Sequence, residues 1–408
     1  MSATLTLGLP AVVGSDLQAP LRDGRLVPYA NLDYAASAPC LETVRDAVAA
    51  ALPAYSSVHR GAGYASQVTT CRYERARQTV GAFAGARTDD AVLFVRNTTD
   101  AMNLLARSLP EGTTVIVFDT EHHATLLPWP SPVRLTPPAL PGEAIRAADE
   151  ALAGVEGPAL LVVTAASNVT GELWPIAGLA HVAHRHGARI AVDAAQLAPH
   201  RPLNVAALDL DYVAFSGHKL YAPFGAGVLI GRPDWLTAAE PYLKGGGAVR
   251  AVGETAEWSA DPQARHEAGT PNVLGAIALA AACETLAATG WAALIREEER
   301  LLGRLRAGLA ALPRVRELAL WPGDHPRVGI VSFTVEGRTA REVAEILAGE
   351  HGIGVRDGKF CAHPFVRHLL GVEDGGCEDG TASAVRASIG LGSTEEHVDR
   401  LLAALRAL

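Results

Sequence analysis

The chain is organised around Phe215-Ser216-Gly217-His218-Lys219-Leu220-Tyr221, which ends an apolar, strand-like run and leads into a glycine-rich segment at 223–227. Lysine is rare in this protein. The only lysines are Lys219, Lys244 and Lys359, and nearly all of the 35 basic residues are arginine. Arginine can replace lysine in an ion pair, but it cannot form a Schiff base. Lys219 is therefore a candidate covalent catalyst, and the alternative is an ordinary, partly exposed lysine.

Size and composition fit a globular enzyme. A chain of 408 residues is long enough for two domains, or for one large α/β domain with an appendage. The net charge of −9 argues against nucleic acid or an anionic membrane as the main partner. The first 20 residues lack the basic region of a secretory signal, and the apolar run at 272–283 is too short to span a bilayer. Five cysteines without a CxxC pair suit a reducing compartment, so we expect a cytoplasmic location.

Apolar strands alternate with amphipathic helices through the first two thirds of the chain. Strands are predicted at 91–95, 114–118, 159–164, 189–192, 212–215 and 227–230. Helices are predicted at 41–52, 67–84, 98–108, 141–152 and 176–186. This pattern predicts an α/β fold with a mostly parallel sheet covered by helices on both faces, in which sites form at the carboxyl ends of the strands.

The last third reads as a smaller α+β domain. Helices are predicted at 273–288, 291–312 and 340–351, and strands at 328–336 and 354–355. A final helix is predicted to begin at Ser393, with Glu396 completing a capping box. We expect an N-terminal arm at 1–20 that packs with the small domain, a large domain at 21–288 and the small domain at 289–408.

Two polar segments at element ends are candidate binding sites. Asn97-Thr98-Thr99-Asp100 opens a helix, where hydroxyls and free N–H groups can bind an anion such as phosphate, although a simple helix cap is the plainer interpretation. His122, in Glu121-His122-His123, follows a strand and could stack on a planar ring and move protons. Neighbouring histidines also occur in metal sites, but no third ligand is suitably spaced, and no metal is expected.

Asp193 ends an apolar strand, with Gln196 three residues later. A carboxylate at a buried strand end is costly unless it has a cationic partner, and a protonated ring nitrogen would supply one. Lys219 lies 219 − 193 = 26 residues later, about one strand–helix–strand step, so both should reach the same edge of the sheet. Asn168, after the strand at 159–164, could meet a phenolate-type oxygen or be a turn residue.

Two further residues complete the candidate site. Arg386 could bind a carboxylate through two hydrogen bonds. Cys361 lies in a glycine-containing loop with Lys359 and His363 close by, where positive charge would favour the thiolate; the alternative is an inert, buried thiol. A stacking histidine, a strand-end aspartate, a Schiff-base lysine and a phosphate-binding helix start together indicate pyridoxal phosphate as the cofactor.

The chain resembles the class V aminotransferase-like family of pyridoxal phosphate enzymes, which has fold type I, and most closely its SufS-type cysteine desulfurases and selenocysteine lyases. The matching stretches run over nearly the whole chain. They are Leu32-Asp33-Tyr34-Ala35-Ala36, His59-Arg60-Gly61, Glu121-His122-His123, Ser167-Asn168-Val169, Val192-Asp193-Ala194-Ala195-Gln196, Ser216-Gly217-His218-Lys219-Leu220-Tyr221, Gly245-Gly246-Gly247, Glu267-Ala268-Gly269-Thr270-Pro271-Asn272 and Arg386-Ala387-Ser388.

The resemblance implies a role for each matching residue. Lys219 would form the Schiff base, Asp193 would pair with the pyridine nitrogen, and His122 would stack on the ring. The ring oxygen would face Asn168 and Gln196. The phosphate would be held by Thr99, Ser216, His218 and the backbone N–H of Thr98. Thr270 would reach the phosphate of a neighbouring subunit, which implies a homodimer with shared active sites. The substrate side would consist of Arg386 on the carboxylate, with Arg356 and Asn168 lining the same pocket, and Cys361 as the sulfur acceptor.

The implied reaction converts L-cysteine to L-alanine, leaves a persulfide on Cys361 and passes the sulfur to an acceptor protein. The alternative is another reaction of the family, a C–S lyase, epimerase or aminotransferase of a specialised pathway, in which Cys361 relays no sulfur. A non-catalytic scaffold is a third possibility, which retention of the catalytic lysine argues against. This chain departs from the family near the substrate: Lys359 and Phe360 stand where two histidines are common, Ala165-Ala166 replaces His-Val, and an acidic loop at 371–380 contains Cys377.

Overall fold

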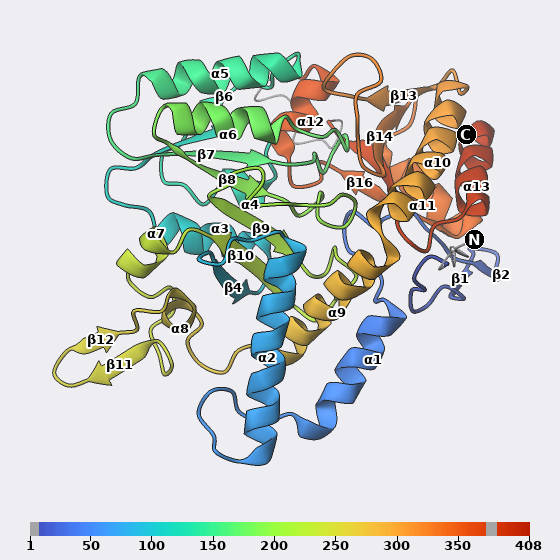
Figure 1. Ribbon diagram of the computed structural model, residues 1–408. Coiled ribbons are helices and arrows are strands. Elements are labelled where there is room, and N and C mark those ends of the chain that lie inside the picture. Colours follow the sequence, from blue (N-terminus) through green and yellow to red (C-terminus); the bar gives the residue numbers. More distant parts are fainter. Residues whose placement is uncertain (1–7, 373–381) are drawn as a thin grey trace, which may run out of the picture.

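A seven-stranded sheet forms the centre of the computed structural model, which describes residues 8–372 and 382–408 (Figure 1). The strand order is β4-β10-β9-β8-β7-β5-β6. In that order the bounds are Ala91–Val95, Gly227–Gly231, Tyr212–Ser216, Arg189–Asp193, Ala159–Thr164, Thr114–Phe118 and Val133–Leu135. Strand β10 runs antiparallel to both of its neighbours, and the other neighbouring pairs are parallel. The prediction of a mostly parallel sheet is confirmed.

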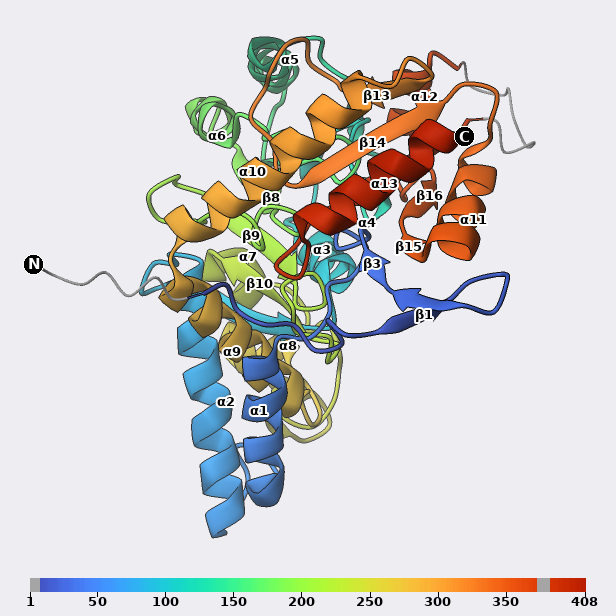
Figure 2. The ribbon, with the colours of Figure 1, turned by 90° about the vertical axis from the view of Figure 1, so that its right-hand side faces the viewer.

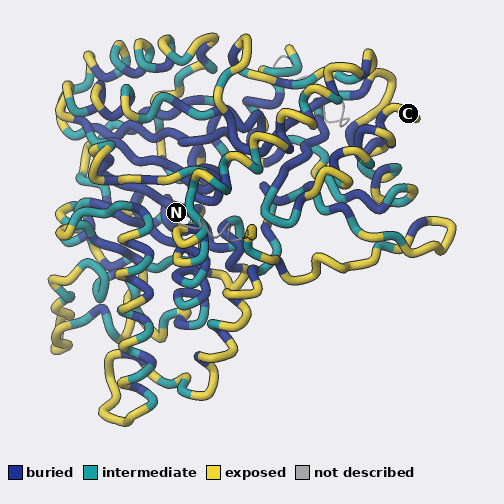
Figure 3. Tube along the Cα trace, turned by 45° about the vertical axis from the view of Figure 1, so that its right-hand side comes forward, coloured by how far each residue is buried: buried dark blue, intermediate teal, exposed yellow. Residues whose placement is uncertain are grey.

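Helices cover both faces of this sheet, because the side chains of each strand alternate between two apolar cores (Figures 1 and 2). Phe118 and Phe215 face the larger core, and Val117 and Ala214 face the smaller one. The larger core is closed by α1 (Glu42–Ala51), α2 (Tyr64–Phe83), α5 (Pro141–Ala153), α6 (Ile176–Arg185) and α9 (Val273–Thr289). The smaller core is closed by α3 (Thr98–Arg107), α4 (His123–Leu126) and α7 (Pro233–Ala238). The central strands are accordingly buried along almost their whole length (Figure 3).

A second, antiparallel sheet carries the C-terminal part of the site. Its strand order is β13 (Val315–Leu318), β14 (Ile330–Val335), β17 (Ala384–Ser388) and β16 (Arg356–Gly358). One face packs against α10 (Trp291–Ala310), α11 (Ala340–His351) and α13 (Glu395–Ala407), and α12 (His363–Leu370) contributes to a separate apolar cluster with Ala384. The register places Arg356 of β16 opposite Arg386 of β17. The sequence did not predict β17, so this pairing of two arginines is a finding of the structure.

The N-terminal segment lies against this smaller sheet and its helices (Figure 2). Strands β1 (Gln18–Pro20) and β2 (Leu26–Pro28) pair with each other, and β3 (Ala30–Asn31) pairs with β15 (Ile353–Gly354). Residues 1–7 lie outside the described part of the chain, and the division into arm, large domain and small domain stays a prediction. A projecting hairpin of β11 (Val249–Val252) and β12 (Ala256–Trp258), followed by α8 (Pro262–His266), completes the fold.

Helices α9 and α10 join the two parts of the molecule at a bend of 86°. Gly290 lies at this bend with φ +86°, a conformation that favours glycine. Across residues 8–372 and 382–408, we find no individual helix with the length and apolar character needed to cross a bilayer; α9 and α10 meet that criterion only as this bent pair.

The last helix, α13, is capped one residue later than the sequence predicted. Thr394 caps α13 by accepting a hydrogen bond from the His397 N–H, whereas the Ser393 hydroxyl accepts from the Gly390 N–H. The predicted capping box between Ser393 and Glu396 is therefore wrong, because the preceding turn takes up the serine hydroxyl.

Candidate active site

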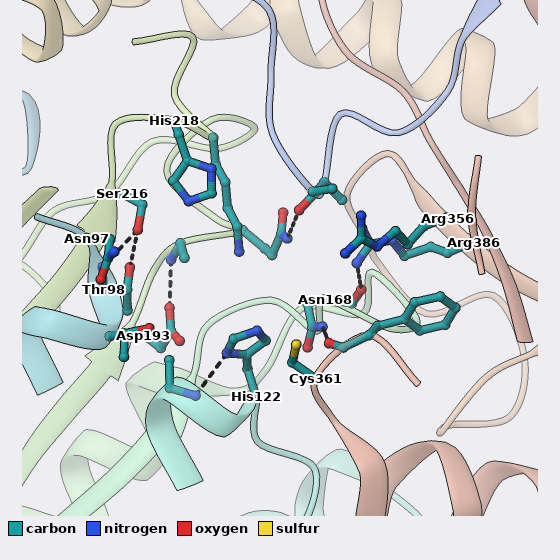
Figure 4. A pocket seen from close by; sticks show the side chains of 18 residues that line it. Asn97, Thr98, His122, Asn168, Asp193, Ser216, His218, Arg356, Cys361 and Arg386 are labelled. Atoms are coloured by element: carbon teal, nitrogen blue, oxygen red, sulfur yellow. Dashed lines mark hydrogen bonds between the residues drawn. The ribbon is translucent and has the colours of Figure 1, made fainter. Parts of the chain in front are cut away.

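One pocket collects nearly all of the residues that the sequence singled out (Figure 4). It lies where β7, β8 and β9 end and α3 begins, and the loop after β16 closes its other side. The predicted site residues that line it are Thr98, Thr99, His122, Asn168, Asp193, Gln196, Ser216, His218, Lys219, Arg356, Cys361 and Arg386. Thr270 is the exception.

The start of α3 forms one end of the pocket. Asn97 caps the helix by accepting a hydrogen bond from the Asp100 N–H. The Thr98 N–H donates to the Ser216 hydroxyl at 2.8 Å, and the two hydroxyls of this pair are also 2.8 Å apart. Strand β10 passes close by: a Cβ on Gly227 would lie 2.7 Å from the Asn97 Cα, so only glycine fits there. Two neighbouring hydroxyls at a helix N-terminus fit a phosphate group.

Asp193 presents its carboxylate at the end of β8 and is only 5% exposed. Its two oxygens accept hydrogen bonds from the Thr125 hydroxyl at 2.7 Å and from the Ala195 N–H at 2.9 Å. These two donors fix the orientation of the carboxylate at the end of the strand. Thr125 belongs to the short helix α4, which the sequence did not predict, so this partner was missed.

Glu121 is a second buried acid near Asp193. Burial raises the pKa of Glu121 well above its ordinary value, and the nearby charge of Asp193 adds to this. One of its oxygens accepts the Thr164 N–H at 3.1 Å. Asp193 lines the pocket and Glu121 does not, so Asp193 is the acid that can pair with a cation there.

His122 is neutral, and its tautomer follows from its hydrogen bond. Burial and the positive charge of Lys219 lower the pKa of His122 to about 3. Its Nδ1 accepts the Ala124 N–H at 3.0 Å as it caps α4, so the proton of the neutral ring lies on Nε2. The ring lines the pocket between Asp193 and Cys361 (Figure 4). It therefore offers a flat face and one N–H donor.

Lys219 follows β9 and lines the wall of the same pocket. Burial lowers the pKa of its amine to about 8; Asp193 opposes this shift and Arg386 adds to it. Burial likewise lowers the pKa of the adjacent His218 to about 4, with Lys219 contributing. An amine with a pKa near 8 is neutral often enough at physiological pH to act as a nucleophile and a base.

Arg386 forms the opposite end of the pocket and is 3% exposed. Its guanidinium donates to the Asn168 carbonyl at 2.9 Å and to the Asp33 carboxylate at 3.3 Å. Burial lowers the pKa of Arg386 to about 10, although Asp33 opposes this. Within the described residues, its buried Nε–H has no hydrogen-bond partner. An unpaired N–H on a buried cation fits a carboxylate ligand. Arg356 is half-exposed beside it, 4.0 Å from Asp33.

Cys361 enters the pocket from a loop that is fixed on both sides. The His123 N–H donates to the Cys361 carbonyl at 2.7 Å, and the Asn168 side-chain amide donates to the Phe360 carbonyl at 2.8 Å. Phe360 and Cys361 have φ values of +50° and +53°, which non-glycine residues rarely adopt. These contacts hold the Cys361 sulfur on the pocket side of the loop (Figure 4). The acidic loop with Cys377 falls mainly within 373–381, outside the described residues.

Thr270 lies apart from the pocket, and Gln196 uses only part of its hydrogen-bonding capacity within it. Thr270 lies in another hollow, lined also by Arg96 and Tyr242, and its predicted contact with a neighbouring subunit stays a prediction. The side-chain amide of Gln196 donates to the Ala35 carbonyl at 2.8 Å, while its buried oxygen has no partner in the part of the chain that the structure describes. Gln196 therefore retains hydrogen-bonding capacity inside the pocket.

Comparison with known proteins agrees with this geometry. The family model described as aminotransferase class-V matches residues 30–401. The chain belongs to this family. Among its relatives in the class-V family are proteins named cysteine desulfurase from Dickeya dadantii, 37% identical over 93% of this chain and 91% of the relative, and from Klebsiella pneumoniae, 36% identical over 93% of both.

Solved structures of the family agree as well. The cysteine desulfurase CsdA from Escherichia coli is 33% identical, with a TM-score of 0.77 over 93% of this chain and 94% of that chain. The apo cysteine desulfurase from Thermococcus onnurineus is 30% identical, with a TM-score of 0.83 over 98% and 99%. Enzymes of this family use pyridoxal phosphate, and the pocket fits that group. It offers a phosphate site at α3, a carboxylate for the ring nitrogen, an amine of lowered pKa, and an unpaired Gln196 oxygen.

Proposed function

We propose that the protein is a pyridoxal phosphate-dependent cysteine desulfurase that converts L-cysteine to L-alanine and takes the sulfur onto Cys361. The observation that carries this proposal is the position of the Cys361 sulfur in the same pocket as Lys219 and Arg386. The names of the relatives support it, because each reported relative is called a cysteine desulfurase.

Binding and proton transfer follow from the geometry of the pocket. Pyridoxal phosphate, when bound, supplies an electron sink for the α-carbon of the amino acid. Arg386 holds the substrate carboxylate through its Nε–H, which has no partner among the described residues, beside its contacts with Asn168 and Asp33. The Lys219 amine, with a pKa near 8, removes the α-proton and can return it.

Sulfur transfer is the task of Cys361. Its thiolate attacks the substrate sulfur, so that a new S–S bond forms and the C–S bond of the substrate breaks, with the electron pair going to the substrate carbon. That carbon then takes up a proton to become the methyl group of alanine. His122 lines this part of the pocket and presents its Nε2–H there, so it can hydrogen-bond to the reacting groups during the step.

The persulfide then leaves the enzyme on an acceptor protein. Cys361 is exposed, which supports such a transfer. We also propose a homodimer in which Thr270 reaches the phosphate of the partner, supported by its place in a separate, open hollow. A cytoplasmic location is proposed as well, supported by the free thiols of the four cysteines that the structure describes.

Incubation of the purified holoenzyme with L-cysteine and a reductant tests the proposal. Equal amounts of alanine and sulfide are expected, and Cys361→Ser should abolish both. Cys71→Ser is the matched control, because Cys71 is exposed on α2 and does not line the pocket. Pyruvate and ammonia as products, with Cys361→Ser still active, would replace the proposal with a C–S lyase of the same family.

A further inference from the structure

Phe360, the residue before the sulfur-accepting cysteine, packs against the arginine at the other end of the pocket. The Arg386 Cζ lies 5.1 Å from the centroid of the Phe360 ring. Both side chains are buried, at 8% and 3% exposure. The ring also belongs to an apolar cluster with Val169, Phe365 and Ala384, so packing fixes its position.

The ring stabilises a guanidinium that is buried and has lost its hydration. Among residues 8–372 and 382–408, Arg386 donates hydrogen bonds to the Asn168 carbonyl and to one oxygen of Asp33, which is itself half-buried. An aromatic face attracts a cation electrostatically, more strongly when both are desolvated. Unlike a histidine or a carboxylate, it takes up none of the N–H groups of the arginine. The Nε–H of Arg386, which has no acceptor within the described part of the chain, is thus left for a ligand.

The backbone of Phe360 joins the same contacts into a closed network. Its carbonyl accepts from the Asn168 side chain, and the Asn168 carbonyl accepts from Arg386. Phe360 and Cys361 both have left-handed φ values, which are unfavourable for such residues unless the surroundings enforce them. The apolar packing of the Phe360 side chain and the two flanking hydrogen bonds, all of which a leucine would keep, supply that restraint. The carboxylate site and the sulfur site are thus held by one residue.

We propose that Phe360 is a positioning residue, which orients Arg386 toward the α-carboxylate of the amino acid and so sets the affinity for carboxylate-bearing substrates. This inference rests on the proposed function, because it assumes that an amino acid binds with its carboxylate at Arg386.

The test compares Phe360→Leu and Phe360→Tyr holoenzymes with a Phe365→Leu control from the same apolar cluster. Leucine removes the aromatic face, whereas tyrosine retains it. For Phe360→Leu, KM for L-cysteine and the dissociation constant of L-alanine, read from the cofactor absorbance, should rise about 5- to 30-fold, with kcat within about twofold. Binding of ethylamine, which lacks the carboxylate of alanine, should not change. Phe360→Tyr, which retains the aromatic face, should have a KM for L-cysteine close to that of the wild-type enzyme.

Several results would overturn the inference. They are an unchanged KM in Phe360→Leu, an equal loss of alanine and ethylamine binding, or the same loss in Phe365→Leu. If the Phe360→Leu variant does not retain the cofactor, Phe360→Met, which keeps the apolar volume, is used in its place. The proposed function fails separately: wild-type enzyme that forms no alanine from cysteine refutes desulfuration, while a selective loss of alanine binding in Phe360→Leu would still support the role of the ring.

Discussion

The lowered pKa of Lys219 can be measured directly, because the chain contains only three lysines. Competitive acylation of the cofactor-free protein across pH 6 to 11, followed by mass spectrometry of the peptides, reports the neutral fraction of each amine. At pH 7.5, a pKa of about 8 leaves about a quarter of the Lys219 amines neutral, against about one in a thousand for an ordinary lysine. For equally accessible amines, the labelling rate of Lys219 should therefore be about 200-fold higher than that of an ordinary lysine.

The midpoint of the labelling curve is the decisive quantity, because restricted access of the reagent to a buried amine slows the labelling but does not move the midpoint. Lys219 should titrate near pH 8, and the exposed Lys244 serves as the internal reference. Asp193→Asn should move the Lys219 midpoint down, and Arg386→Gln should move it up, because the charges of these residues act in those directions. A Lys219 midpoint at or above that of Lys244 would refute the electrostatic account of this pocket.

Three further predictions concern contacts that the structure defines. Arg77→Met leaves the buried carboxylate of Glu267, now 2.6 Å from the guanidinium, without its cation, so denaturant titration should show a loss of about 3–5 kcal/mol in unfolding free energy. Adding Glu267→Gln should recover most of it, and no recovery would contradict the pairing. Arg386→Lys keeps the charge but loses at least one charged hydrogen bond, about 1.5–3 kcal/mol, so KM for L-cysteine should rise about 10- to 150-fold in steady-state assays. An unchanged KM would place the carboxylate elsewhere. Thr125→Val removes the hydroxyl that donates to Asp193, and equilibrium dialysis should show cofactor affinity weakened about tenfold or more, with Thr125→Ser near wild type.

The sequence predicted the central sheet well, because its strands are apolar runs buried on both faces. The strands at 91–95, 114–118 and 159–164 match the structure residue for residue. Strand β17 escaped prediction, since a charged residue at its centre, Arg386, breaks the apolar pattern. That arginine is buried only because Asp33 and Asn168, from distant parts of the chain, meet it. Such compensation cannot be read from a local pattern.

The chemistry of the site was largely predictable, and its supporting contacts were not. Asp193 ends β8 and Lys219 follows the end of β9, the edge where an α/β sheet places its functional groups. Thr125 reaches Asp193 from 68 positions away, and the ring of Phe360 reaches Arg386 from another strand's loop. Both contacts depend on tertiary packing. The residue types of Thr125 and Phe360 do not indicate these contacts in the sequence, because threonine and phenylalanine are common at such positions.

The charged residues divide the pocket into two halves, and each half is suited to a different ligand. In one half Asp193 faces Lys219, and in the other Asp33 faces Arg386. Burial lowers the pKa of both cations, so the acid that faces each of them only partly offsets the cost of burying positive charge. Each half therefore gains from an incoming anion: the phosphate and ring oxygen of the cofactor in the first, and the substrate carboxylate in the second. A bound carboxylate would favour the charged form of Arg386, so the affinity for amino acids depends on the guanidinium staying in the second half of the pocket. The Phe360 ring holds the guanidinium in this position, and displacing it should therefore lower the affinity for amino acids.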